Sequence, residues 1–158
     1  QRGADARSVH LSQFPPTPAG WMDETLAQKW ERIFTVRRTV TAALEVERRE
    51  KRIGASLEAR VDVAIADPAF LDAFEGEDAA DIFITSEANL GDAAWSEDGK
   101  PISLLAGQIV VASSRASGVK CARSWKYFDP ATADPDFPDI TARDAAAVRE
   151  IRGLGAGR

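Results

Sequence analysis

The longest stretch without glycine or proline contains residues 24–52, and it constrains the fold more than any other part of the chain. Apolar residues recur in it at helical spacing and form one stripe, made of Leu26, Trp30, Ile33, Val40 and Leu44. Asp23 can cap the first turn, and Gly54 ends the run. The pattern predicts one long helix that buries this stripe.

Two positive charges interrupt the stripe, because at 100° per residue Arg37 and Arg48 fall on its apolar side. A buried charge without a partner is strongly unfavourable. Glutamates of a neighbouring element could pair with the two arginines, or that end of the helix could open toward an anionic ligand. The alternative is a solvated helix face with one buried ion pair.

The rest of the chain predicts an α+β fold with a small mixed sheet and an irregular tail that ends in a helix. Alternating and apolar runs predict three strands, at residues 57–65, 82–85 and 104–114. Short helices are expected at 69–74 and 77–81, and turns at 89–91 and 98–99.

Both ends of the chain contain proline-rich segments that predict irregular structure. Prolines make residues 1–22 irregular, apart from a short extended candidate at 8–11. A proline-containing loop at 129–138 precedes a final helix through about Leu154, for which Thr141 is the expected N-cap, with Asp144 placed as in a capping box.

The composition suits a soluble domain with a real core, since 44% of the 158 residues are hydrophobic and 28% are charged. No apolar run is long enough to span a membrane, and no secretory leader is visible. The single cysteine fits a reducing compartment. Because the chain does not begin with methionine, we expect a fragment of a longer polypeptide.

The net charge of −5 hides two basic segments. Residues 29–52 carry eight Lys or Arg against four Glu, and residues 101–128 carry four Lys or Arg and no acid. Within the second segment, residues 117–127 mix basic and aromatic side chains, as surfaces for nucleic acid do. Screening lets such patches act locally despite the overall charge.

No catalytic residue is predicted. The chain has no glycine-rich phosphate loop and no nucleophile elbow, and the carboxylates of 72–98 read as a solvated surface. His10, the sole histidine, is expected to be structural. Cys121 alone cannot make a structural zinc site, which needs four Cys or His ligands.

Four pieces of the chain stand out together: Ser8-Val9-His10-Leu11 with Phe14-Pro15, the helix with Trp30, Arg37, Ala43-Leu44-Glu45 and Arg48, the run Ile53-Gly54-Ala55-Ser56-Leu57-Glu58-Ala59, and Lys120-Cys121-Ala122-Arg123-Ser124-Trp125. In this order and spacing they resemble the C-terminal part of bacterial isoleucyl-tRNA synthetase. The resemblance implies three parts: residues 1–54 as the end of a helical anticodon-binding domain, 55–115 as a small α/β module, and 116–158 as a zinc-knuckle-like tail.

The resemblance also implies where a zinc ion would bind in relatives. Those four positions are here Cys121, Ser124, Thr141 and Asp144, so three of the four ligands are absent. We therefore expect that zinc is lost and that other interactions hold the tail. The candidates are the Thr141 cap, the loop prolines, and packing of the aromatic residues Trp125, Tyr127 and Phe128.

Carried over from the family, Arg123 and Trp125 would contact the anticodon, and Lys120 and Lys126 would contact phosphates. An arginine beside a tryptophan suits single-stranded bases, because the ring can stack on them. Trp125 could instead be a core aromatic. Weaker phosphate-contact candidates come from the long helix and its end, and are Arg38, Arg49 and Arg52.

The implied parent is a cytoplasmic, monomeric ligase that attaches isoleucine to its tRNA. ATP and magnesium would belong to its catalytic domain, outside this chain, so no cofactor is expected here. The expected partners are isoleucine tRNA and the rest of the synthetase, with no membrane. The competing hypothesis is a structural or docking domain that supports the synthetase without reading RNA.

Overall fold

The structure is a computed structural model that describes residues 15–91, 102–104 and 109–155. Its α+β architecture confirms the predicted fold class. The extended candidate at 8–11, His10 and the turn at 98–99 lie outside the described residues. Among the described helices, none is both long and apolar enough for a membrane crossing.

A 26-residue helix, α1 (Glu24–Arg49), follows a short 3-10 turn at Ala19–Trp21 and confirms the predicted long helix. The Asp23 carboxylate caps it, accepting a hydrogen bond from the Leu26 amide at 2.9 Å. The stripe is buried from Ile33 to Leu44, whereas Leu26 near the start is 49% exposed.

Four strands form one mixed sheet in the order β2-β1-β4-β3. A 3-10 turn at Ser56–Glu58 leads into β1 (Ala59–Ile65), which pairs parallel with β2 (Glu87–Gly91). On its other side β1 pairs antiparallel with β4 (Ile109–Arg115), and β4 pairs with β3 (Ile102–Leu104). The predicted strand at 104–114 is thus divided between β3 and β4.

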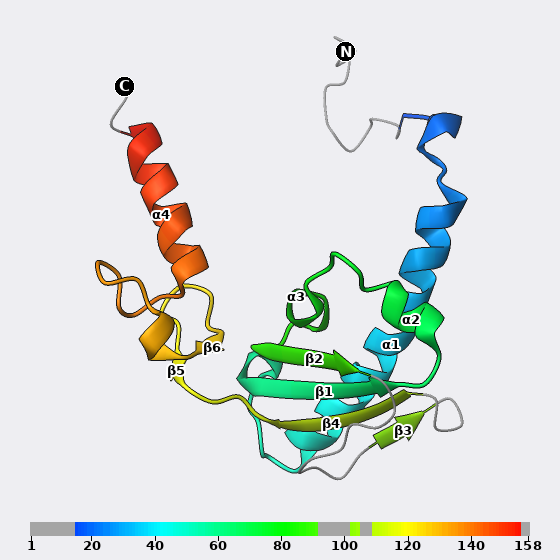
Figure 1. The fold of residues 1–158 in the computed structure, drawn as a ribbon, viewed down its shortest axis with the longest axis horizontal. Coiled ribbons are helices and arrows are strands. Elements are labelled where there is room, and N and C mark those ends of the chain that lie inside the picture. The colour runs from blue at the N-terminus through cyan, green and yellow to red at the C-terminus, as the bar shows by residue number, and fades with distance from the viewer. Residues whose placement is uncertain (1–14, 92–101, 105–108, 156–158) are drawn as a thin grey trace, which may run out of the picture.

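One apolar core joins α1 to the sheet and to two short helices, α2 (Pro68–Asp72) and α3 (Ala79–Phe83). In Figure 1, α1 crosses behind the sheet, and its first turns project beyond it. The buried core members come from α1, α3, the sheet and the loops between them, among them Ile33, Val36, Val40, Val61, Val63, Ile65, Phe83 and Val111, and Phe70 and Leu71 of α2 pack against them while partly buried. The middle of α1 and the described part of residues 55–115 therefore pack as one unit.

The predicted strand at 82–85 is wrong, because this segment ends a helix. Asp78 caps α3 by accepting from the Asp81 amide at 3.1 Å, and Phe83 is buried beside Phe74 with ring centroids 5.6 Å apart. Ile84 then turns the chain in the left-handed region. The true strand is β2, which includes the residues 89–91 predicted as a turn. A short apolar run does not distinguish helix from strand, and here the cap decides.

The tail is a smaller unit with a second, separate apolar cluster. It contains a hairpin, β5 (Val119–Lys120) with β6 (Tyr127–Phe128), a 3-10 turn at Pro130–Thr132, and α4 (Ala142–Gly155). Cys121, Ile140 and Ala145 are buried in the cluster, with Phe128, Phe137 and Val148 packed against them. Figure 1 shows α4 and the start of α1 rising on opposite sides of the sheet.

Candidate nucleic-acid interface

The four positions that correspond to zinc ligands in the resemblance come together at the start of α4. The Cys121 thiol donates to Asp144 Oδ2 at 3.2 Å, and the Thr141 hydroxyl donates to the same oxygen at 2.8 Å. The Ser124 amide donates to Cys121 Sγ at 3.4 Å. Residues distant in sequence thus converge on one carboxylate.

Thr141 caps the start of α4, as predicted, since its hydroxyl oxygen accepts a hydrogen bond from the Asp144 amide at 3.1 Å. Burial raises the pKa of Asp144, but the hydrogen bonds from Thr141 and Cys121 and the charge of Arg123 outweigh burial and hold the pKa below its ordinary value. The Ser124 hydroxyl contributes in the same direction, although its buried oxygen meets no partner at hydrogen-bonding geometry. The carboxylate therefore stays ionised at neutral pH.

This donor set does not suit zinc. A structural zinc site takes four ligands from Cys and His side chains, with carboxylates as occasional replacements. Here the cluster offers one thiol and one carboxylate, and the carboxylate is already occupied by two side-chain donors. No group of three His, Cys, Asp or Glu side chains gathers anywhere among the described residues.

Trp125 faces solvent rather than the core, with 61% of its surface exposed. It sits in the turn between β5 and β6 with φ of 64°, a left-handed conformation that is uncommon for a bulky residue. The turn is fixed by the Trp125 amide donating to the Cys121 carbonyl at 3.1 Å. The Lys120 amine lies 5.1 Å from the centre of the indole ring, at cation–π distance.

Arg123 and Lys126 lie near Trp125 in the same turn, and both already have acidic partners. Arg123 Nε lies 3.7 Å from Asp144 Oδ1, while 42% of the Arg123 side chain stays exposed. Lys126 forms an ion pair with Asp81 of α3 and is only 22% exposed. The turn thus presents Trp125, Lys120 and Arg123 outward and directs Lys126 toward the module.

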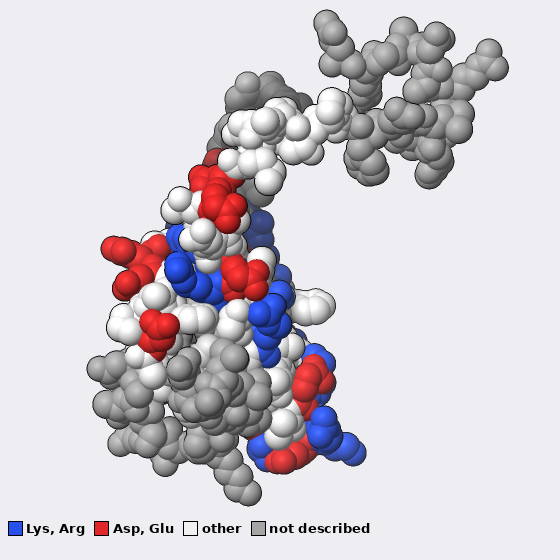
Figure 2. All heavy atoms as spheres, turned by 90° about the vertical axis from the view of Figure 1, so that its right-hand side faces the viewer, with Lys and Arg blue, Asp and Glu red and all other residues white. Residues whose placement is uncertain are grey.

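The three arginines predicted on α1 and just after it lie on another part of the molecule. Arg38 is exposed and bonds to Thr35, and Arg49 is exposed. Arg52 donates two hydrogen bonds to the buried Glu47, at 2.6 and 2.7 Å. On the face shown in Figure 2, basic and acidic side chains of the described residues alternate, without a continuous basic patch among them.

The two arginines on the apolar stripe are accommodated in different ways. Arg37 is half-buried, and its Nε donates to the backbone carbonyl of Ile82 at 2.9 Å. Arg48 is exposed and pairs with Glu45 of the same helix at 2.8 Å. Neither needs a glutamate from a neighbouring element. Both line a cavity of about 210 Å³ beside α3.

The loop before α4 is fastened by residues that the sequence did not single out. Arg149 pairs with Asp134 and Asp136, with Nη2 at 2.7 and 2.8 Å from their carboxylate oxygens. The guanidinium groups of Arg149 and Arg152 also lie 5.3 and 5.1 Å from the Phe137 ring centre. Sequence offered no signal for this clamp, because the partners are 13 and 15 positions apart across an irregular loop.

Comparison with known proteins gives one consistent group of relatives. An isoleucine–tRNA ligase of Brucella abortus is 51% identical over 94% of this chain. The ligases of Agrobacterium fabrum and Bartonella henselae are 51% and 45% identical over 97% and 98% of it. The chain is homologous to a C-terminal segment of isoleucine–tRNA ligase. A scan against protein-family models returns no match.

The match to isoleucine–tRNA ligase confirms the resemblance seen in the sequence. The chain spans only 15–16% of the length of these relatives. The match therefore shows homology to one segment of these ligases.

Proposed function

We propose that this chain is the tRNA-recognition end of an isoleucine–tRNA ligase and that the turn at 121–126 contacts the anticodon loop. The observation that carries the proposal is the exposure of Trp125 on a strained turn between basic residues. A bulky aromatic in the left-handed region is unfavourable by about 1–2 kcal/mol, and strained backbone is often concentrated at functional sites.

The geometry favours stacking of a single base on Trp125. Lys120 lies over the ring, and 61% of the Trp125 surface stays exposed, which leaves room for a base. Stacking contributes about 1–3 kcal/mol per base and tolerates any sequence. Arg123 lies two residues away with its guanidinium partly exposed and can donate to a base edge or a phosphate. Lys120 completes the contact with the phosphate backbone.

We propose further that the tail does this without zinc. Structural zinc supplies about 10–16 kcal/mol in small peptides, and in this chain several smaller interactions act together. They are the Thr141 cap, the hydrogen bonds to Asp144, and the Arg149 clamp on the loop. Tyr127 and Phe128 are half-buried and contribute packing, whereas the exposed Trp125 does not.

The start of α1 supports the other expected partner, the rest of the synthetase. Trp21 and Met22 are 76% and 79% exposed, and with Leu26 and Trp30 they line an apolar hollow. A surface of this kind is typical of contact with another protein segment. Catalysis with ATP and magnesium would lie in that larger part, in a monomeric cytoplasmic enzyme, and this segment would contribute no catalytic residue.

Competition binding tests the reading role. Isoleucine tRNA labelled with a fluorophore is bound to the chain and displaced by unlabelled tRNA with either the cognate or an altered anticodon. We expect the altered tRNA to compete less well, and we expect Trp125→Ala to remove the difference. Equal competition by both tRNAs would contradict the proposal. A salt titration with no slope would contradict the phosphate contacts.

A docking role is the second candidate, and it is favoured by the ion pairs that tie the tail to the module. Lys126 and Arg143 of the tail both bind Asp81. If the tail only supports the parent fold, a ligase carrying Arg123→Ala with Trp125→Ala keeps its aminoacylation rate but unfolds at lower temperature. Under the recognition role, the same variant loses aminoacylation through a higher KM for tRNA.

A further inference from the structure

Asp81 is the residue at which the tail meets the α/β module. Its carboxylate pairs with Lys126 and, through Oδ2, with Arg143 Nη1 at 2.8 Å. The hydrogen bond from Lys126 lowers the pKa of Asp81, and Arg143 adds to this against the effect of burial. Partners 45 and 62 positions away in sequence thus converge on one ionised group.

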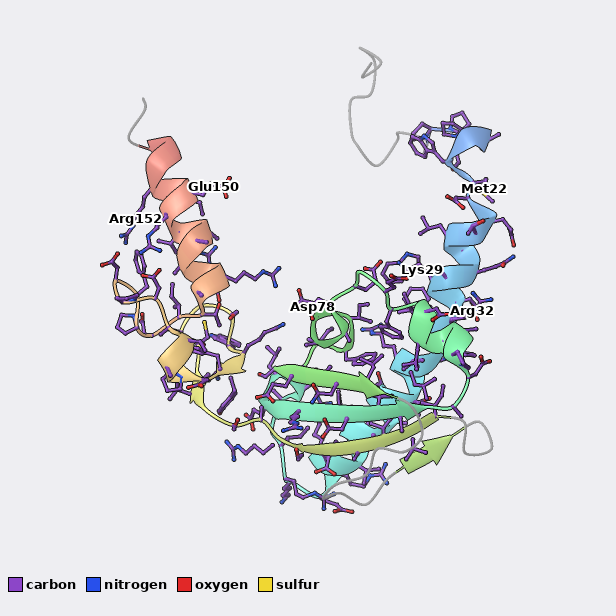
Figure 3. All side chains as sticks on the ribbon, viewed as in Figure 1. Met22, Lys29, Arg32, Asp78, Glu150 and Arg152 are labelled. Atoms are coloured by element: carbon purple, nitrogen blue, oxygen red, sulfur yellow. The ribbon has the colours of Figure 1, made fainter. Side chains whose placement is uncertain are left out.

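The two cations come from different elements of the tail. Lys126 directly follows Trp125 in the hairpin turn, and Arg143 lies in the first turn of α4, beside Asp144. A single carboxylate therefore fixes both the turn that carries Trp125 and the helix whose carboxylate holds Arg123. In Figure 3, Asp78 marks the start of α3, on the side of the module that faces the tail.

Ser86 adds a neutral contact next to this charged one. Its hydroxyl donates to the Leu57 carbonyl at 2.5 Å and accepts from the Tyr127 amide at 2.6 Å. Leu57 and Ser86 belong to the module, and Tyr127 belongs to the hairpin. The tail is thus attached along the segment from α3 to β2, in addition to its covalent link through Ala116.

The burial of Lys126 indicates what its ion pair does. An amine that binds RNA from solution is expected on an open surface, whereas this side chain is 22% exposed and directed at Asp81. A hairpin with two residues per strand has little stability of its own. Its orientation must therefore come from contacts to the module.

We propose that Asp81 is a positioning residue that holds the Trp125 turn in a fixed orientation for RNA, with Lys126 as its anchor and not as a phosphate ligand. This inference rests on the proposed RNA recognition for its purpose, but the positioning itself can be measured without RNA. In the rival arrangement, Asp81 competes with an RNA phosphate for Lys126, so removing the Asp81 charge would strengthen RNA binding.

The positioning is tested by the distance between spin labels at two exposed sites, Ala42→Cys on α1 and Ala146→Cys on α4. Pulsed electron paramagnetic resonance should give one narrow distance distribution for the parent. Asp81→Asn should broaden it, and Arg143→Gln, which leaves α3 intact, should broaden it as well. The control Asp72→Asn removes an exposed acid of the same module and should change nothing. A distribution unchanged in Asp81→Asn overturns the proposal.

The same variants are then titrated with an anticodon stem–loop RNA. Asp81→Asn should bind about three- to tenfold more weakly than Asp72→Asn, and adding Lys126→Met to Asp81→Asn should change the affinity little further. Tighter binding by Asp81→Asn would overturn the inference in favour of competition. If none of the chains binds the RNA, the recognition function fails, while a broadened distribution still supports positioning by Asp81.

Discussion

The α/β module and the tail are held together by different kinds of interaction. Among the described residues, the core that the module shares with α1 gathers fifteen buried apolar side chains, whereas the tail cluster has three. The tail depends instead on a helix cap, on hydrogen bonds to Asp144, and on the Arg149 clamp. A unit too small to bury much apolar surface needs specific polar or metal contacts.

The largest loss of stability is expected from a substitution in the core between α1 and the sheet. Ile33 is fully buried between α1 and the sheet, so Ile33→Ala should lower the free energy of unfolding by about 2–5 kcal/mol. Urea denaturation measures the loss. The control Leu26→Ala, on the same helix but 49% exposed, should change it by less than about 0.5 kcal/mol. Similar losses in both variants would contradict the packing of α1 on the sheet.

The tail has a comparable weak point in its backbone at Gly118, which has φ of 90°. An added Cβ would lie 2.1 Å from the Phe128 carbonyl oxygen, so Gly118→Ala must separate the two hairpin strands. The matched variant Gly76→Ala also has positive φ, at 78°, but open space around its Cβ. It should lose only the conformational term of about 1–2 kcal/mol.

Hydrogen exchange of backbone amides distinguishes the two glycine variants. Gly118→Ala should lose protection throughout residues 119–128 while β1 stays protected, because the module core does not include the hairpin. Gly76→Ala should leave the tail unchanged. Equal tail protection in both variants would show that the close approach of Gly118 to Phe128 does not hold the hairpin.

Removal of the cap should have a smaller effect, confined to α4. Thr141→Ala takes away the acceptor for the Asp144 amide and one donor to the Asp144 carboxylate, and should destabilise the tail by about 1 kcal/mol. Thr141→Ser keeps the hydroxyl and should retain most of the stability. Local unfolding free energies of α4 from hydrogen exchange provide the measurement, and a loss in the serine variant as large as in alanine would rule out the cap.

The clamp should have the smallest effect at neutral pH, because the Arg149 side chain is 47% exposed and ion pairs open to solvent contribute little. The hydrogen bond from Arg149 lowers the pKa of Asp134 below its ordinary value of 3.8. A carboxylate whose pKa is lowered on folding stabilises the fold above its unfolded pKa, and this contribution is lost as the pH falls through the folded pKa. Acid should therefore release the loop from α4.

Amide chemical shifts of residues 130–139 followed from pH 7 to pH 2 would report this release. We expect Arg149→Gln to shift the Asp134 titration upward toward its ordinary range. Arg152→Gln, which also removes a guanidinium from the Phe137 ring, should leave the Asp134 titration in place. An Asp134 titration that ignores Arg149→Gln would contradict the clamp.

Much of α1 and of the module could be predicted from sequence, because their signals are local. Capping by Asp23, the buried stripe from Ile33 to Leu44, and the alternation in β1 each depend on neighbours within a few positions. The segment 82–85 could not be assigned correctly, since its β-branched and aromatic residues favour a strand. Capping by Asp78 and burial of Phe83 override that preference.

The candidate site was partly predictable for the same reason. Trp125, Arg123 and Lys120 are close in sequence, and the structure brings them to one turn. The exposure of Trp125 and the partners of Lys126 and Arg149 depend on residues far away in sequence. No local pattern indicates Asp81, because its two partners lie 45 and 62 positions later in the chain.

Metal content decides whether polar contacts hold the tail in place of zinc. The chain is purified without chelator, analysed for zinc by mass spectrometry, and followed by hydrogen exchange before and after chelator is added. We predict zinc well below one ion per chain and unchanged protection of residues 119–155. One zinc ion per chain, with loss of tail protection when the chelator removes it, would contradict the account.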